Sequence, residues 1–153
     1  MIYVLALMIA LAGSAATAAT PAQAAKASEK GKATYIPASK VDGSVQNTIA
    51  ARLTGGSEYS VMIARRTQAG QSELHENETD IFYIAEGAAT FVTGGEIEGG
   101  KTTEPGEIRG AGIKNGETHQ LRKGDVIVIP RQTPHWYKGV NGEVKYFIVK
   151  IRE

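Results

Sequence analysis

The sequence contains no cysteine and only 3 His among its 153 residues. The absence of cysteine excludes disulfide scaffolds, thiolate zinc sites, cysteine nucleophiles and a lipidated lipoprotein cysteine. An excess of charge of one sign is also missing, because 17 Lys and Arg stand against 16 Asp and Glu. A nucleic-acid-binding domain normally carries a basic excess or stripe, so we expect no nucleic-acid partner. The sequence also lacks a phosphate-binding glycine loop, an EF-hand loop, a zinc-protease HExxH and a serine-nucleophile elbow.

Charged side chains are absent from residues 1–25. The apolar run Ile2–Leu11 is followed by small residues, and Ala22–Ala24 fits the small-x-small pattern of signal peptidase sites. We interpret residues 1–25 as a secretory signal peptide, although the usual Lys or Arg near its start is missing. A retained membrane anchor is the alternative. Both interpretations place the domain outside the cytoplasm, and cleavage predicts a periplasmic or secreted protein with no membrane partner.

The rest of the chain predicts one domain with an N-terminal extension. Residues 26–44 predict a flexible leader and extension, and residues 45–153 suffice for one hydrophobic core. No convincing helical pattern follows Lys32, and short β-rich runs alternate with glycine and proline. We expect strands at residues 59–66, 72–75, 80–86, 89–93, 118–122, 126–129 and 144–151, and a strand or short helical turn at 48–53. This pattern is typical of an all-β sandwich or barrel.

Residues 96–116 differ from the rest of this domain. They contain six glycines and show little apolar periodicity, which predicts a long loop or hairpin. Long loops in compact domains often carry binding functions. A binding lid and an insertion without a role both fit this composition.

Two segments carry the side chains best suited to chemistry. Glu73 and His75 are two residues apart, so in a strand their side chains project from the same face. Asp80 follows a polar turn, and a hairpin there would return it beside that pair. His135 stands just past a predicted strand and a proline-rich turn.

These two segments resemble the paired motifs of the cupin superfamily, and the resemblance covers about residues 45–152. The second motif, G-x5-P-x-G-x2-H-x3-N, is matched by Gly124, Pro130 and His135 at the right spacing. Gln132 and Gly139 replace its second glycine and its asparagine.

The first motif, G-x5-H-x-H-x3-4-E-x6-G, is less complete. Glu73 stands for its first histidine, His75 matches the second, Asp80 replaces the glutamate, and Gly87 matches the final glycine. Another alignment takes His75 and Asn77 as the first two ligands, but it leaves only two residues before Asp80. We therefore prefer the alignment that begins at Glu73.

The resemblance implies both a fold and a cofactor. Family members are double-stranded β-helix (jelly-roll) barrels of two antiparallel sheets, often dimeric, and commonly bind one divalent metal inside the barrel. Carried over residue by residue, the ligands are Glu73, His75, Asp80 and His135. Two imidazoles with one or two carboxylates suit Mn, Fe, Ni, Cu or Zn. If one carboxylate stays unbound, open positions remain for dioxygen or a substrate.

Simpler roles stay open for the same residues. Glu73 and His75 could be a solvated strand pair, and His135 could be a buried histidine bonded to a backbone carbonyl. His119 precedes the second motif and is a candidate proton shuttle at the pocket mouth, with an exposed strand histidine as the alternative.

The sequence therefore predicts an exported, homodimeric cupin with one divalent transition metal and a small-molecule ligand or substrate. One hypothesis is a metal-dependent oxygenase, isomerase or lyase acting on a small polar molecule, with His119 or a metal-bound water moving protons. The alternative is a non-catalytic cupin that holds a small ligand in the periplasm. Both hypotheses stand at this point, because this fold is kept while functions change.

Overall fold

Two long strands with alternating buried residues form the centre of the fold. In β4 (Glu78–Thr93) the side chains of Asp80, Phe82 and Ile84 are buried, and in β11 (His135–Arg152) those of Tyr146 and Ile148 are buried. Because strand side chains alternate between faces, one face of each strand points inward. The two strands pair antiparallel from His135 opposite Thr93 to Arg152 opposite Glu78, with three irregularities in the register.

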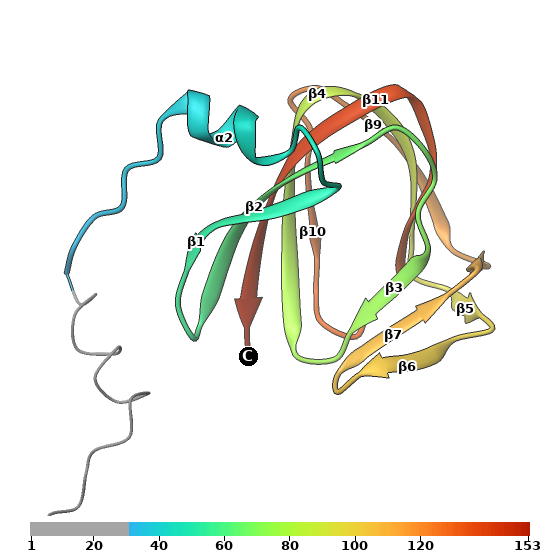
Figure 1. The fold of residues 1–153 in the computed structure, drawn as a ribbon. Coiled ribbons are helices and arrows are strands. Elements are labelled where there is room, and N and C mark those ends of the chain that lie inside the picture. The colour runs from blue at the N-terminus through green and yellow to red at the C-terminus, as the bar shows by residue number, and fades with distance from the viewer. Residues whose placement is uncertain (1–30) are drawn as a thin grey trace, which may run out of the picture. The chain divides into compact units, whose positions relative to one another are not determined.

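The structure is a computed structural model that describes residues 31–153, and residues 35–153 of it form one unit. The signal peptide predicted for residues 1–25 lies outside the described residues. Nowhere in the described range does a helix have the length and apolar character needed to cross a membrane. The fold is all-β, as the sequence predicts, and its strands curve around a common interior (Figure 1).

The strands form one large and one small sheet. The other strands are β1 (Ala50–Gly55), β2 (Tyr59–Arg66), β3 (Ser72–His75), β5 (Glu96–Glu98), β6 (Lys101–Glu104), β7 (Glu107–Gly110), β8 (Gly112–Lys114), β9 (Glu117–Arg122) and β10 (Val126–Ile129). In the nine-stranded sheet the order is β1-β2-β11-β3-β7-β6, and β4 joins β11 to β9 and β10. Strands β5 and β8 pair separately. The predicted strands at 59–66, 72–75 and 126–129 have the bounds of β2, β3 and β10.

One helix among the described residues corrects the expectation that no helix follows Lys32. This helix, α2 (Ala38–Ser44), begins after Pro37, whose carbonyl accepts hydrogen bonds from the amides of Lys40 and Val41. Val45 follows the helix and is fully buried. Seven residues are too few to show an apolar repeat, so the helix depends on this anchor more than on its own pattern.

Gly87 bends a strand where the sequence predicts that it ends. The expected strands at 80–86 and 89–93 are one continuous strand, β4. Gly87 has a φ of 77°, and a Cβ there would overlap the carbonyl oxygen of Glu143. Glycine alone fits this close approach, which lets β4 and β11 stay paired through the bend. The expected strand at 144–151 likewise begins earlier, at His135.

Of the long loop or hairpin that the sequence predicts for residues 96–116, the structure has strands and a hairpin. They form β5 to β8, and the β6–β7 hairpin adds two strands to the sheet beside β3. Figure 1 shows this hairpin running next to β3. All four side chains of β6 are exposed, so this edge has no apolar alternation that could signal a strand.

Aromatic side chains fill the interior next to the predicted ligands. The rings of Phe91 and Tyr137 lie 4.7 Å apart, and Phe82 stacks on Tyr137 at 6.2 Å. The ring of His135 lies 6.1 Å from Phe91 and 6.2 Å from Phe82. His135 is therefore packed against these aromatic rings, and this packing fixes the position of its imidazole.

Candidate functional site

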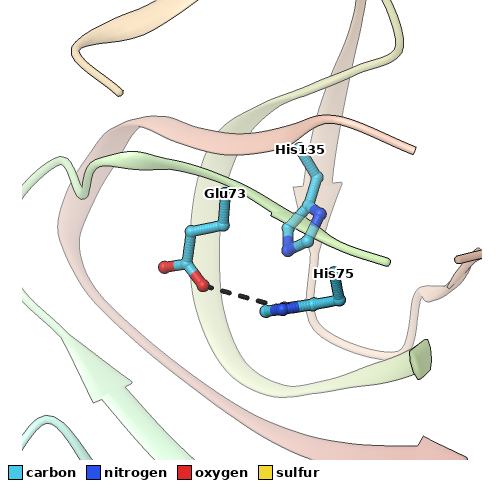
Figure 2. A group of neighbouring side chains, drawn as sticks. All are labelled: Glu73, His75 and His135. Atoms are coloured by element: carbon cyan, nitrogen blue, oxygen red, sulfur yellow. Dashed lines mark ion pairs between the residues drawn. The ribbon is translucent and has the colours of Figure 1, made fainter. Parts of the chain in front are cut away.

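The structure brings together the side chains that the two sequence motifs single out. Glu73 and His75 project from β3, and His135, the first residue of β11, pairs with Glu73 across the strands. One ligand atom from each of these three side chains lies within 4.8 Å of the others. Figure 2 shows the Glu73 carboxylate facing the His75 ring, with Oε2 3.9 Å from Nε2.

Asp80 completes this group from β4. Its Oδ2 atom lies 3.4 Å from Nε2 of His75 and 3.9 Å from Nε2 of His135, and only 2% of the residue is exposed. Asp80 therefore lies beside both histidines, whereas the group whose ligand atoms all lie within 4.8 Å of one another consists of Glu73, His75 and His135. Two metal bonds of 2.0–2.2 Å at roughly tetrahedral or right angles put donor atoms about 3 to 3.5 Å apart, so the 3.4 Å between Asp80 and His75 already fits one ion and the longer distances would have to shorten.

Both histidines present Nε2 to this group because their Nδ1 atoms are engaged elsewhere. Nδ1 of His75 lies 2.7 and 2.8 Å from the two carboxylate oxygens of Glu107, and Nδ1 of His135 lies 3.1 Å from the carbonyl oxygen of Thr133. Carbonyl and carboxylate oxygens only accept, so each Nδ1 carries the proton and donates. Nε2 of His135 then has a free lone pair, which is the form that binds a metal. Nε2 of His75 faces Oδ2 of Asp80 at 3.4 Å, so metal binding there would release the proton that these two groups share.

Basic side chains hold the two carboxylates of the group. Nζ of Lys150 lies 2.9 Å from Oδ1 of Asp80, and Nη1 of Arg109 lies 2.9 Å from Oε1 of Glu73. Nη2 of Arg66 is farther from the same Glu73 oxygen, at 3.6 Å. Oε2 of Glu73 stays directed at His75. The cations thus fix the carboxylates, although Lys150 also contacts Oδ2 of Asp80, the oxygen that faces the histidines, at 3.3 Å.

Burial and charge shift the pKa values of the group in different directions. Burial opposes ionisation of Asp80, but the hydrogen bond from His75 and the nearby Lys150 outweigh it and lower the pKa of Asp80. Burial also disfavours the charged form of His75, yet Asp80 outweighs it and raises the pKa of His75. Burial dominates at His135 and lowers its pKa. His135 is therefore held neutral, as a metal ligand requires.

The group lies in the wall of a cavity of about 830 Å³. Its ionisable lining, histidines aside, consists of five acids (Glu73, Glu78, Asp80, Glu104, Glu107) and three bases (Arg66, Arg109, Lys150). The lining thus carries a negative excess of two charges, which one divalent cation would balance. Burying carboxylates without compensating charge is costly, so the donor set and its charge both fit a divalent metal.

Three residues of the site were missed from the sequence. Glu107 and Arg109 come from the segment predicted as a long loop or hairpin, and Lys150 lies in the last strand. Their spacing is the one feature of the sequence that could have indicated them: Glu107 and Arg109 are two residues apart, as are their partners His75 and Glu73. Opposite charges at matching spacing fit neighbouring strands, but nothing local shows that β3 and β7 are neighbours.

His119 is not brought to this cavity. It lies in β9 opposite Phe91, and its Nε2 is 2.8 Å from the hydroxyl of Thr93. His119 is absent from the residues that line the cavity. The structure therefore places it apart from the four predicted ligands.

A second group of possible ligand atoms shares His75. Atoms of His75, Glu78 and Glu107 also lie within 4.8 Å of one another. Glu107 is occupied by Nδ1 of His75, and Glu78 pairs with Lys150 at 3.0 Å and Arg152 at 2.9 Å. The two carboxylates of this second group are thus already paired with His75, Lys150 and Arg152.

Comparison with known proteins connects this geometry to a family. The family model described as Cupin matches residues 26–152. A Bacillus halodurans protein of known structure superposes with a TM-score of 0.57 at 12% identity, covering 81% of this chain and 85% of that one. The cupin domain of Schizosaccharomyces pombe Cnp3 superposes at 0.51 with 11% identity, and the match covers 68% of this chain but only 60% of that one.

An RmlC-like cupin with a double-stranded β-helix fold from Methanocaldococcus jannaschii superposes with a TM-score of 0.49 at 13% identity, covering 68% of this chain and 79% of that one. No match to the sequence is found among curated proteins. Identities this low show the fold alone. The family match spans most of the sequence and includes all four predicted ligands, so the chain belongs to the cupin family.

Proposed function

We propose that this cupin binds one divalent transition metal and is a metal-dependent enzyme, an oxygenase, isomerase or lyase, acting on a small polar molecule. One observation carries the proposal. One ligand atom from each of His75, His135 and Glu73 lies within 4.8 Å of the others, in the wall of a cavity large enough for a small substrate. Two histidines and one carboxylate leave coordination positions open.

The residues divide into ligands and supports. Glu73, His75 and His135 would hold the metal, with Asp80 as the fourth candidate. When bound, such a metal supplies a Lewis acid that polarises a coordinated oxygen. Lys150 keeps the carboxylate of Asp80 ionised, and the acidic and basic groups of the cavity wall would orient a polar substrate.

We also propose that the protein is exported to the periplasm or secreted, and that it is a homodimer. The residue pattern of positions 1–25 supports export. Exposed apolar side chains on the outer face of the sheet support a second copy as partner. Val126, Val128 and Tyr83 are 61%, 56% and 45% exposed, and Val126 pairs directly with Tyr83 across β10 and β4. Apolar patches of this kind mark protein contacts.

Metal content tests the proposal. The protein should be purified from the periplasm without a His tag and analysed by plasma mass spectrometry. We expect about one equivalent of Mn, Fe, Ni, Cu or Zn in the wild type. A double variant, His75→Ala with His135→Ala, should lose the metal, whereas His119→Ala is the matched control and should keep it. Wild-type protein that stays below a tenth of an equivalent after metals are added back would contradict the proposal.

Metal removal should also appear in stability, because the ion binds only the folded chain. At a free metal concentration of about 100 Kd, binding adds about 2.7 kcal/mol to the free energy of unfolding. For a domain of this size that is roughly a 10 °C rise in Tm. A chelator should abolish the rise in the wild type and leave the double variant unchanged, as measured by calorimetry.

Open coordination separates an enzyme from a closed structural site. Nitric oxide should bind to protein loaded with Fe(II) and give an iron–nitrosyl signal in electron paramagnetic resonance. The absence of this signal in a fully iron-loaded sample would contradict the catalytic part of the proposal and favour a non-catalytic cupin.

A further inference from the structure

The β6–β7 hairpin supplies one partner for each of the two candidate ligands on β3. In the antiparallel register His75 stands opposite Glu107, and Glu73 stands opposite Arg109. Directly opposed side chains lie on the same face of a sheet and contact each other. Both ligands of β3 are therefore held by a strand of the segment that the sequence predicts to be a long loop or hairpin.

Glu107 contacts His75 more closely than any other acid does. Both of its oxygens lie within 2.8 Å of Nδ1, whereas His135 has only the carbonyl of Thr133 at 3.1 Å. A hydrogen bond to a carboxylate is about twice as strong as one to a neutral acceptor and makes the imidazole more electron-rich at Nε2. Glu107 therefore fixes both the tautomer and the ring orientation of His75.

Arg109 acts in the same way on Glu73. Its Nη1 atom lies 2.9 Å from Oε1 of Glu73, and its Nη2 atom lies 3.7 Å from Oε2 of Glu107. The guanidinium thus joins the two acids and turns Oε2 of Glu73 toward His75. The hairpin arranges both ligands before any ion arrives, so binding requires less ordering.

We propose that Glu107 is a positioning residue of the metal centre: it holds Nδ1 of His75 and keeps Nε2 directed at the other candidate ligands, and the β6–β7 hairpin thereby sets the affinity of the centre for its ion. The inference rests on the proposed function, since it concerns the same ion. It assigns a role to residues 101–110, which lie outside both sequence motifs. Removal of such a partner commonly costs 10–100-fold in metal affinity.

Cobalt(II) titration followed by visible absorption measures the affinity directly. We expect Glu107→Ala to weaken cobalt binding by about 10–100-fold. Glu107→Gln should restore part of the loss, because the amide oxygen still accepts the Nδ1 proton. Glu104→Ala is the matched control: it removes an acid from the same hairpin and cavity without touching a histidine. Glu104 stands opposite Glu107, but its side chain is exposed, so its charge is largely screened and the affinity should stay within about twofold of the wild type.

The tautomer of His75 gives a second readout that needs no metal. Long-range proton–nitrogen spectra of the metal-free wild type should show His75 protonated at Nδ1, and Glu107→Ala should populate the Nε2-protonated form. Equal cobalt affinities in Glu107→Ala and Glu104→Ala, or an unchanged tautomer, would overturn the inference. If Glu107→Ala does not fold, Glu107→Gln decides by the same two measurements.

The two readouts also separate this inference from the proposed function. A wild type that binds no metal, but whose His75 tautomer depends on Glu107, would remove the metal proposal and keep Glu107 as the residue that positions His75. A wild type that binds cobalt with the same affinity as Glu107→Ala would keep the metal proposal and remove this inference.

Discussion

Lys150 and Asp80 are cross-strand partners, and the ammonium nitrogen of Lys150 lies 2.9 and 3.3 Å from the two carboxylate oxygens of Asp80. Asp80 is 2% exposed and the Lys150 side chain 17% exposed, so the pair is well shielded from water. A buried carboxylate without a cation is strongly unfavourable. Lys150 therefore neutralises the charge of the Asp80 carboxylate in the metal-free protein, and a bound metal ion would add to this neutralisation.

The first prediction concerns this pair. Lys150→Met should lower the free energy of unfolding by about 3 kcal/mol in chelator, because it leaves Asp80 buried without a cation. The loss should be smaller in the presence of zinc. Urea denaturation measures both values. Lys138→Met, at an exposed position of the same strand, is the control. Equal losses in the two variants would contradict the role of Lys150.

The second prediction concerns pH. The pKa of His135 is lowered by burial, so the unfolded chain takes up a proton there more readily than the folded chain. The stability from His135 is thus present above the unfolded pKa of about 6.5 and is lost as pH falls below it. The pKa of His75 is raised, so its contribution has the opposite sign and is lost as pH rises through its folded pKa.

Urea denaturation in chelator between pH 5 and 8 should separate these two contributions. His135→Gln should flatten the loss of stability on the acid side relative to the wild type. His75→Gln should steepen it, because the group that stabilises the fold at low pH is removed. Profiles of the two variants that run parallel to the wild type would show that neither histidine is linked to folding.

The third prediction concerns the bend in β4. Gly87→Ala should lower the free energy of unfolding by about 3 kcal/mol, because a side chain at positive φ is strained and its Cβ meets the Glu143 carbonyl. Gly139→Ala, on the neighbouring strand, meets no atom within 4 Å and should stay within about 1 kcal/mol of the wild type. Thermal melts of both variants check this. Similar melting temperatures would mean that the backbone relaxes at Gly87.

The fourth prediction concerns the proposed dimer. Val128→Lys should convert a two-chain particle into a one-chain particle, because a charge in the centre of an apolar contact must be desolvated. Light scattering after size exclusion gives the mass. Thr102→Lys, at an exposed position of β6, should leave the mass unchanged. A wild type that is a single chain at high concentration would end the dimer proposal.

The local sequence pattern was enough to predict those strands whose own residues and flanking turns are typical of a strand. Residues 59–66 and 126–129 are rich in β-branched or aromatic side chains and match β2 and β10, and the short run 72–75 matches β3. The candidate ligands were found because strand spacing and a family motif both point to them. Their convergence depends on β3, β4 and β11, whose order the family resemblance implies and local pattern alone does not.

The remaining errors have a common physical cause. The β6–β7 hairpin lies at the sheet edge, where polar side chains face water and no apolar alternation develops. Gly87 marks a bend or an end equally well until the close approach of Glu143 is known. The short helix α2 depends on one buried valine that follows it. Each feature is decided by contacts with distant residues, which a local window does not contain.

The position of β11 at the end of the chain order has a consequence for assembly. His135 opens this strand, and Lys150 near its end pairs with Asp80, 70 residues earlier. Closing a loop of this length costs entropy before the contacts form, so such pairings are slow. No shorter run of strands preceding β11 contains the complete group of side chains. The ion would therefore be captured by a chain that has already folded, and the rate of reconstitution after denaturation would follow refolding and not the supply of metal.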